Sequence, residues 1–116
     1  MNVETTTVDF LTEHPALAGV LVSMQVPRQR PPRFVTVERT GGPEERYRGI
    51  PTLAVQVWAA DRFLASELAL VVQAALQEMV QRADIARVSV PNVYNFPDPD
   101  SGQARYQLTV ELVTTD

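Results

Sequence analysis

The chain has 116 residues, no cysteine, a hydrophobic content of 45% and a formal net charge of −4. This length suits one ordinary domain with a real core, and the lack of cysteine excludes disulfides, thiolate catalysis and cysteine-based metal sites. An acidic chain lacks the basic face that sequence-independent nucleic-acid binding needs, and we expect no apolar run that approaches the roughly 18–20 residues needed to span a bilayer.

The N-terminal segment predicts one short helix. Its first ten residues contain acids where a signal peptide has a basic segment, so we expect no classical export. Thr5, Thr6 and Thr7 are suitable N-cap residues, and Pro15 disfavours helix at the residue before it. We therefore expect a helix over residues 6–13. The only acid–histidine grouping that is close in sequence consists of Asp9, Glu13 and His14.

Three runs of alternating apolar residues predict strands at residues 19–26, 33–40 and 52–59. The first strand ends in a segment with three prolines, which exclude regular structure there. Trp58, near the end of the third strand, is most simply a packing residue, with an interface anchor as the alternative. The proline-rich segment also holds a basic cluster, for which a solvated loop is the simpler interpretation and contact with an acidic protein stays open: Arg28, Arg30 and Arg33.

Residues 41–51 are longer than the about two to five residues usual in a hairpin connection, so we expect an extended loop or one ordered by a partner. Its charged side chains have two interpretations. They can stay solvated and contribute little to folding, or they can pair across an interface between identical subunits. The residues concerned are Glu44, Glu45, Arg46, Tyr47 and Arg48.

A long helix is predicted from the N-cap Asp61 to Ala83, since this stretch contains neither glycine nor proline. At about 100° per residue, three apolar residues fall inside the polar arc: Phe63, Leu70 and Ala74. They form either a partner surface or a group covered by the first helix or a loop of the same chain. The opposite arc is the predicted core face and contains Leu64, Ala65, Leu68, Ala69, Val71, Val72, Ala75, Leu76 and Met79.

Two more strands are predicted at residues 86–96 and 104–113. Pro91 lies inside the first, which indicates an edge position or a bulge. The motif Asp98-x-Asp100-x-Gly102 between them matches only the start of a calcium-binding loop, so an acidic turn is favoured. The last strand alternates clearly, and its predicted core side consists of Tyr106, Leu108, Val110 and Leu112.

These elements predict an α+β fold, a single mixed, mostly antiparallel sheet of about five strands covered on one face by one long and one short helix. The long helix joins the third and fourth predicted strands, which can therefore be parallel, while hairpins can join the others. The sequence contains no nucleophile elbow and no glycine-rich phosphate loop. We expect no catalytic, cofactor-binding or metal-binding residues, and the pattern favours an assembly protein or binding module.

A family resemblance extends over residues 33–113, which contain in order PTLAVQVWAADRFLASELALVVQAAL, a strand beginning Ala-Asp-Ile-Ala-Arg-Val, and YNFPDPDSGQARYQLTVELV. This series resembles the tail-terminator (tail-completion) proteins of long-tailed bacteriophages. The resemblance implies a hexameric ring in the tail or neck of the virion, assembled in the host cytoplasm. Such a ring caps the tail tube, ends its polymerisation and joins the head connector. It implies the tube protein, the head–tail connector and further copies of the chain as partners, with no catalytic residue and no cofactor.

A closed ring needs head-to-tail subunit contacts. We assign to them the Phe63, Leu70 and Ala74 group, the 41–51 segment and the polar face of the sheet. Two alternatives remain within the particle, another head–tail neck adaptor and a tail tube subunit. The third interpretation, a small α+β ligand-binding domain or enzyme, lacks a set of convergent polar groups in the sequence.

Overall fold

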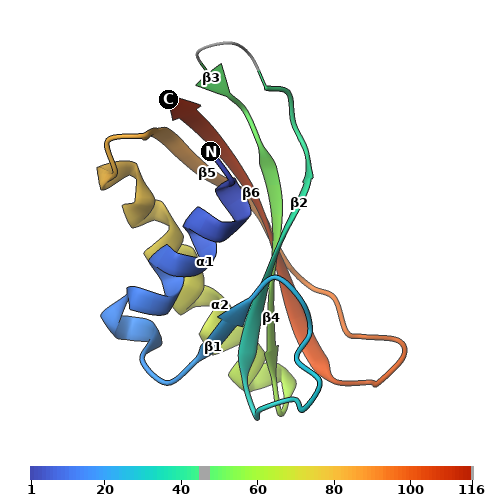
Figure 1. The fold of residues 1–116 in the computed structure, drawn as a ribbon. Coiled ribbons are helices and arrows are strands. Elements are labelled where there is room, and N and C mark those ends of the chain that lie inside the picture. Colours follow the sequence, from blue (N-terminus) through green and yellow to red (C-terminus); the bar gives the residue numbers. More distant parts are fainter. Residues whose placement is uncertain (45–47, 116) are drawn as a thin grey trace.

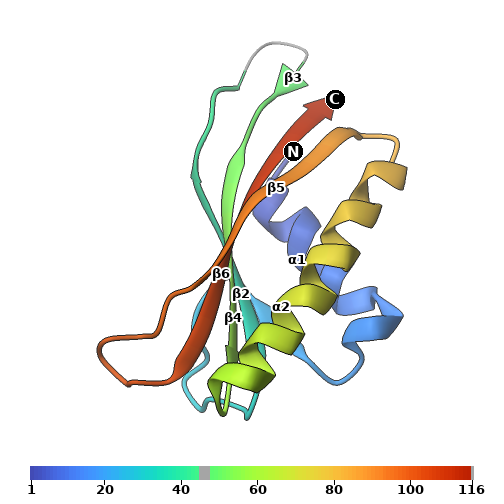
Figure 2. The ribbon, with the colours of Figure 1, turned by 180° about the vertical axis from the view of Figure 1, so that it is seen from behind.

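The structure is a computed structural model that describes residues 1–44 and 48–115. One mixed sheet carries two α-helices on one face, as Figures 1 and 2 show from opposite sides, and the predicted α+β class is confirmed. The helices are α1 (Val3–Glu13) and α2 (Arg62–Gln77), each followed by a short 3-10 turn, η1 (Pro15–Leu17) and η2 (Glu78–Gln81). The strands are β1 (Leu21–Ser23), β2 (Phe34–Gly41), β3 (Arg48–Gly49), β4 (Thr52–Ala59), β5 (Ile85–Asn95) and β6 (Ala104–Thr115).

The sheet has the order β1-β2-β4-β6, with β5 on the far side of β6. The short strand β3 continues β4 along β6 in the same register, because Thr52 pairs with Glu111 and Gly49 pairs with Thr114. Both β4 and β5 are antiparallel to β6, so these two strands run in the same direction with β6 between them. The expected direction is therefore correct, although the two strands are not neighbours.

The pairing of β1 with β2 differs from the expectation. We predicted a hairpin, whereas the structure pairs the two strands in parallel, with Val22 opposite Val35. The proline-rich segment between them carries the chain back to the end at which β1 began, so that the first residue of β2, Phe34, lies opposite Leu21. Strand β1 is also shorter than predicted, because Met24 and Val26 leave the ladder and are exposed.

Both helices begin at a side-chain cap. Helix α1 starts three residues earlier than predicted, because Asn2 rather than a threonine caps it: the Thr5 amide donates to Asn2 Oδ1 at 3.2 Å. Asp61 caps α2 as predicted, accepting the Leu64 amide at 2.8 Å. The α-helical part of α2 ends at Gln77, short of the predicted Ala83, and continues as η2.

Strand β5 lies at an edge of the sheet and has a register shift between Ser89 and Asn92, around Pro91. Both predictions for this strand, an edge position and a bulge, are therefore confirmed. Strand β6 is the strand next to it, and its core side is confirmed for Leu108, Val110 and Leu112, which are fully buried.

The core lies between the sheet and the helices. Helix α2 packs on β4, β5 and β6, while α1 packs on β1 and β2. The segment Arg62–Gln81 is long and apolar enough, by length and composition, to cross a membrane. Its buried residues nevertheless pack against the sheet, as in the core helix of a globular domain. Fully buried side chains from the sheet include Val35, Val37, Leu53, Val55 and Val57.

Candidate assembly surface on helix α2

Helix α2 carries a group of exposed apolar side chains on its solvent side. The exposed fraction is 68% for Phe63, 60% for Leu70, 47% for Leu64 and 37% for Val71, and Ala74 is also exposed. Their spacings of three, four and seven residues place them on one stripe of the helix. We call these five residues the α2 band. Of the two interpretations for Phe63, Leu70 and Ala74, cover by the same chain is wrong: these side chains face solvent.

Two members of the α2 band were predicted to be core residues, and that prediction is wrong. Leu64 and Val71 lie at the rim of the buried face, where the helix faces η1 and the end of the proline-rich segment instead of the sheet. Because those parts do not close on the helix, a groove of about 200 Å³ remains, lined by Leu64, Val71, Ala16 and Pro32 among others. The other seven residues of the predicted core face are buried.

One charged residue lies inside the α2 band. Glu67 is exposed, and by its spacing it lies between Phe63, Leu70 and Val71 on the helix surface. Within the described part of the chain its carboxylate makes no ion pair and no side-chain hydrogen bond. The band therefore combines an apolar surface with one carboxylate that has no ion-pair or hydrogen-bond partner within the described residues, and Arg33 lines the same groove as Glu67 without forming an ion pair with it.

The 41–51 segment lies at the other end of the molecule, as the positions of β3 and of the first turn of α2 show in Figures 1 and 2. The structure does not bring the two predicted groups of interface residues together. Arg48 belongs to β3 and is exposed, so part of the predicted loop is a strand. Glu44 pairs with Arg39 of its own chain at 2.8 Å. The predicted interface residues Glu45, Arg46 and Tyr47 lie outside the described residues.

On the helix-free face of the sheet, Trp58 is only 2% exposed, so its prediction as a packing residue is confirmed. Its ring stacks on Phe34, with centroids 5.1 Å apart, and the guanidinium of Arg105 lies 4.8 Å from its centroid. Arg30 reaches this cluster from the proline-rich segment and donates a hydrogen bond to Gln103 at 2.9 Å. Arg30, the middle residue of the basic cluster, therefore makes contacts that stabilise the fold.

The acidic motif after β5 forms a turn. Asp98 is buried, and its carboxylate accepts hydrogen bonds from the Ser101 hydroxyl at 2.6 Å and the Asp100 amide at 3.2 Å. The Ser101 hydroxyl, the backbone amides and the nearby Arg105 together hold the pKa of the Asp98 carboxyl below its ordinary value, against the opposing effect of desolvation. The Asp98 carboxylate oxygens thus stabilise the turn, as the acidic-turn interpretation expects.

Polar side chains on the same face form a ladder across four strands. Gln56 donates to Gln107 at 2.8 Å, and Gln107 donates to the Tyr94 hydroxyl at 2.7 Å. Thr36 accepts a hydrogen bond from the Trp58 indole at 3.3 Å. These groups are paired with one another, so the predicted polar sheet face is partly occupied by contacts within the subunit.

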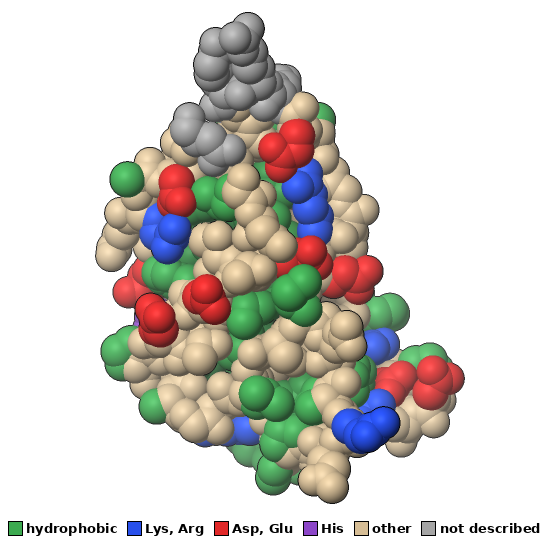
Figure 3. Space-filling model, in the orientation of Figure 1, with side chains coloured by type: hydrophobic (Ala, Val, Ile, Leu, Met, Phe, Trp, Pro, Cys, Tyr) green, Lys and Arg blue, Asp and Glu red, His purple; other side chains and the backbone are tan. Residues whose placement is uncertain are grey.

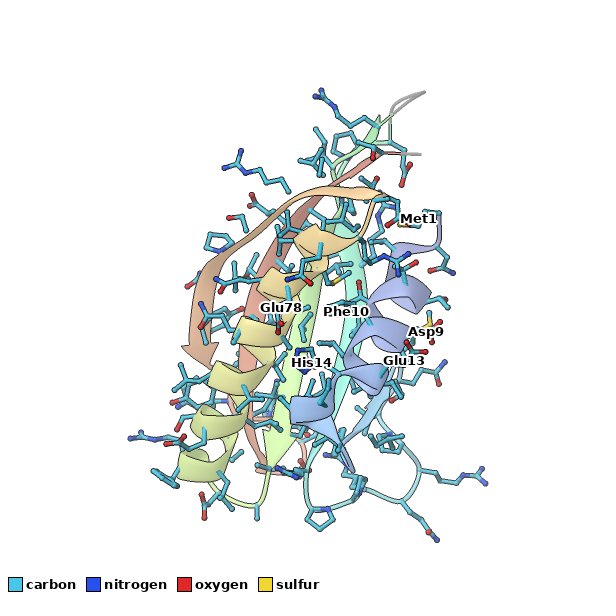
Figure 4. All side chains as sticks on the ribbon, turned by 90° about the vertical axis from the view of Figure 1, so that its left-hand side faces the viewer. Met1, Asp9, Phe10, Glu13, His14 and Glu78 are labelled. Carbon is cyan, nitrogen blue, oxygen red and sulfur yellow. The ribbon has the colours of Figure 1, made fainter. Side chains whose placement is uncertain are left out.

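The single histidine does not combine with its sequence neighbours Asp9 and Glu13. Figure 4 shows His14 and Glu78 pointing toward one another between the two helices, with Asp9 and Glu13 directed away. The His14 Nε2 atom lies 2.6 Å from Glu78 Oε2, and Nδ1 accepts the Ala16 amide at 3.1 Å. Both ring nitrogens of His14 thus have a partner, and the contact between His14 and Glu78 links the end of α1 to the end of α2. Across residues 1–44 and 48–115, no group of three or more histidine, aspartate or glutamate residues could hold a metal ion.

Comparison with known proteins adds no relative: neither the family models nor the curated proteins searched contain a match to this chain. The role of the α2 band must therefore be inferred from its exposed residues and their chemistry.

Proposed function

We propose that this chain is a structural subunit that assembles with copies of itself into a ring, in the role of a phage tail terminator. The observation that carries the proposal is the α2 band, which places Phe63 and Leu70 in solvent on the central helix of the domain. Groups of exposed large apolar side chains are typical of protein–protein contacts, because exposing them to water costs free energy.

The rest of the proposal comes from the family resemblance of residues 33–113. A terminator ring ends polymerisation of the tail tube and joins it to the head connector. The partners would be the tube protein, the connector and, in a ring proposed to be hexameric, five further copies of the chain. The confirmed α+β architecture agrees with the fold that this resemblance implies.

The polar groups described above support an assembly role over a ligand-binding one. Gln56, Gln107 and Tyr94 bond to one another across the sheet, and His14 bonds to Glu78. Each of these groups stabilises the fold at a sheet or helix contact. The α2 band and the Glu67 carboxylate within it, in contrast, have no such contact with the described residues of the subunit.

The test is assembly of the purified chain, measured by size-exclusion chromatography with light scattering and by electron microscopy. We expect a closed oligomer for the wild type and a folded monomer for Leu70→Glu, because a buried unpaired carboxylate is costly at an interface. Gln73→Glu is the matched control, since it adds the same charge to α2 outside the band. A Leu70→Glu variant that assembles normally, or that unfolds, contradicts the proposal.

Position in the particle separates the terminator from its two alternatives. Labelled chain at the head-proximal end of the tail tube supports the terminator. Label along the whole tube identifies a tube subunit, and label within the neck above the tube end identifies an adaptor.

A further inference from the structure

A second apolar surface lies beside β1. This strand is at the edge of the sheet, with β2 on one side only, and the chain bends directly after it at residues 24–25, which are exposed. Leu21, Met24 and Val26 expose large parts of their side chains there. Together with Val8 of α1 they line an open groove of about 570 Å³, which we call the β1 groove. Figure 3 shows hydrophobic side chains gathered on this part of the surface, near β1.

A positively charged residue lines the β1 groove. Arg28 lines it and is exposed, and its guanidinium makes no ion pair or side-chain hydrogen bond within the part of the chain that the structure describes. Its neighbour Arg30, in contrast, is bound to the turn after β5. The α2 band thus contains one free carboxylate, on Glu67, and the β1 groove contains one free guanidinium, on Arg28.

We propose that the β1 groove receives the α2 band of a neighbouring copy of the chain, with Arg28 of one copy facing Glu67 of the next. This inference rests on the proposed ring function and identifies the two surfaces that meet. Apolar burial supplies the attraction, and the pair of opposite charges fixes the register of the two surfaces.

Charge also explains why each surface prefers the other to itself. A symmetric contact between two α2 bands brings two Glu67 carboxylates near the same axis, and a contact between two grooves does the same with Arg28. Like charges placed opposite one another in this way oppose binding. A contact between unlike surfaces repeats from copy to copy, and it closes into a ring where the rotation between copies closes, as the proposed function requires.

The first test is a charge exchange. Arg28→Glu and Glu67→Arg should each weaken assembly about tenfold, the size expected for one close charge pair, and the double variant should restore it. Urea unfolding of the monomer at low concentration should be unchanged in all three, because both residues are exposed and make no ion pair or side-chain hydrogen bond within the described part of the subunit. Single variants with wild-type assembly, or a double variant weaker than either single variant, overturn the contact.

The second test uses the absence of cysteine from the chain. Met24→Cys and Leu70→Cys chains are mixed and treated with a short bifunctional maleimide, with circular dichroism as the check on folding. We expect a cross-linked dimer from the mixture, and none from Leu70→Cys alone or from Ala86→Cys, an exposed control on β5, mixed with Leu70→Cys.

The outcomes separate the two proposals. Assembly that depends on Leu70 without a cross-link to position 24 removes the β1 groove as the partner and leaves the ring function standing. A cross-link of Leu70→Cys to itself shows a symmetric contact and has the same consequence. A wild-type chain that does not assemble, together with cysteine variants that do not cross-link, overturns both.

Discussion

The guanidinium of Arg30 lies over the ring of Trp58, 5.1 Å from its centroid, and joins the proline-rich segment to the helix-free face of the sheet. Arg105 lies over the same ring from strand β6, where it pairs with Trp58 across the ladder. Arg30 also reaches Ser101 and Asp98 in the turn after β5. Two loops far apart in the sequence are thus held over one buried tryptophan.

Arg30→Ala should lower the free energy of unfolding by about 1–2 kcal/mol, since it removes a cation–π contact and hydrogen bonds that are partly shielded from water. Urea unfolding followed by Trp58 fluorescence measures the change. Arg28→Ala is the matched control and, measured on the monomer at low concentration, should stay within about 0.5 kcal/mol of wild type. Equal effects of the two substitutions would show that Arg30 does not hold the two loops.

A pair of leucines on α2 tests where the core ends. Leu68 is 5% exposed, and Leu68→Ala should cost about 2–5 kcal/mol of stability through lost burial and a residual cavity. Leu64→Ala should cost less than about 1 kcal/mol, because nearly half of that side chain is already in water. Thermal or urea unfolding of the monomer at low concentration gives both values. Similar losses would place Leu64 in the core after all.

Thr7 is fully buried in α1, and its hydroxyl has no hydrogen-bond partner among the described residues. Thr7→Val keeps the shape and removes the unpaired polar group, so we expect a gain of about 1 kcal/mol in stability. Thr5→Val on the exposed side of the same helix is the control for helix propensity. Destabilisation by Thr7→Val alone would show that the hydroxyl is paired in solution.

The pKa of Asp98 is lowered in the folded state, so the ionised carboxylate favours folding. That contribution is fully present above the ordinary pKa of 3.8, and is lost as the pH falls through the lower pKa of the folded state. Stability measured from pH 6 to pH 2 should therefore fall less steeply at the acid end for Asp98→Asn than for wild type. Ser101→Ala removes the largest cause of the shift and should move the Asp98 pKa, followed by carboxyl NMR shifts, upward.

Gly42 directly follows β2 and has a φ of 94°, which residues with a Cβ rarely adopt. A Cβ at this position would lie 2.0 Å from the carbonyl oxygen of Ile50. Gly42→Ala should therefore cost more than about 1 kcal/mol, the usual cost of a strained backbone position. Gly102→Ala is a useful comparison, because its φ is also positive but no atom obstructs the Cβ. Equal losses of stability in the two variants would show that the positive φ, and not the contact with Ile50, causes the whole effect.

Local signals predicted several features well. Strand β4 has the predicted bounds, residues 52–59, and α2 begins after the predicted cap Asp61. For the candidate surface, the helical projection identified Phe63, Leu70 and Ala74 as residues that point away from the core. It misplaced Leu64 and Val71, because a projection gives the direction of a side chain and not the width of the face that the sheet covers.

By itself, the sequence determined which segments are helices or strands and which face of each is apolar, since caps, prolines and hydrophobic periods act within a few residues. Only the tertiary structure decided that β1 runs parallel to β2, that β3 extends β4 along β6, and that Arg30 meets Trp58 and Ser101. These contacts join residues far apart along the chain, and their free energy exists only once the sheet has formed. The same holds for the α2 band, whose Leu64 and Val71 are exposed because no other part of the described chain packs over that side of the helix.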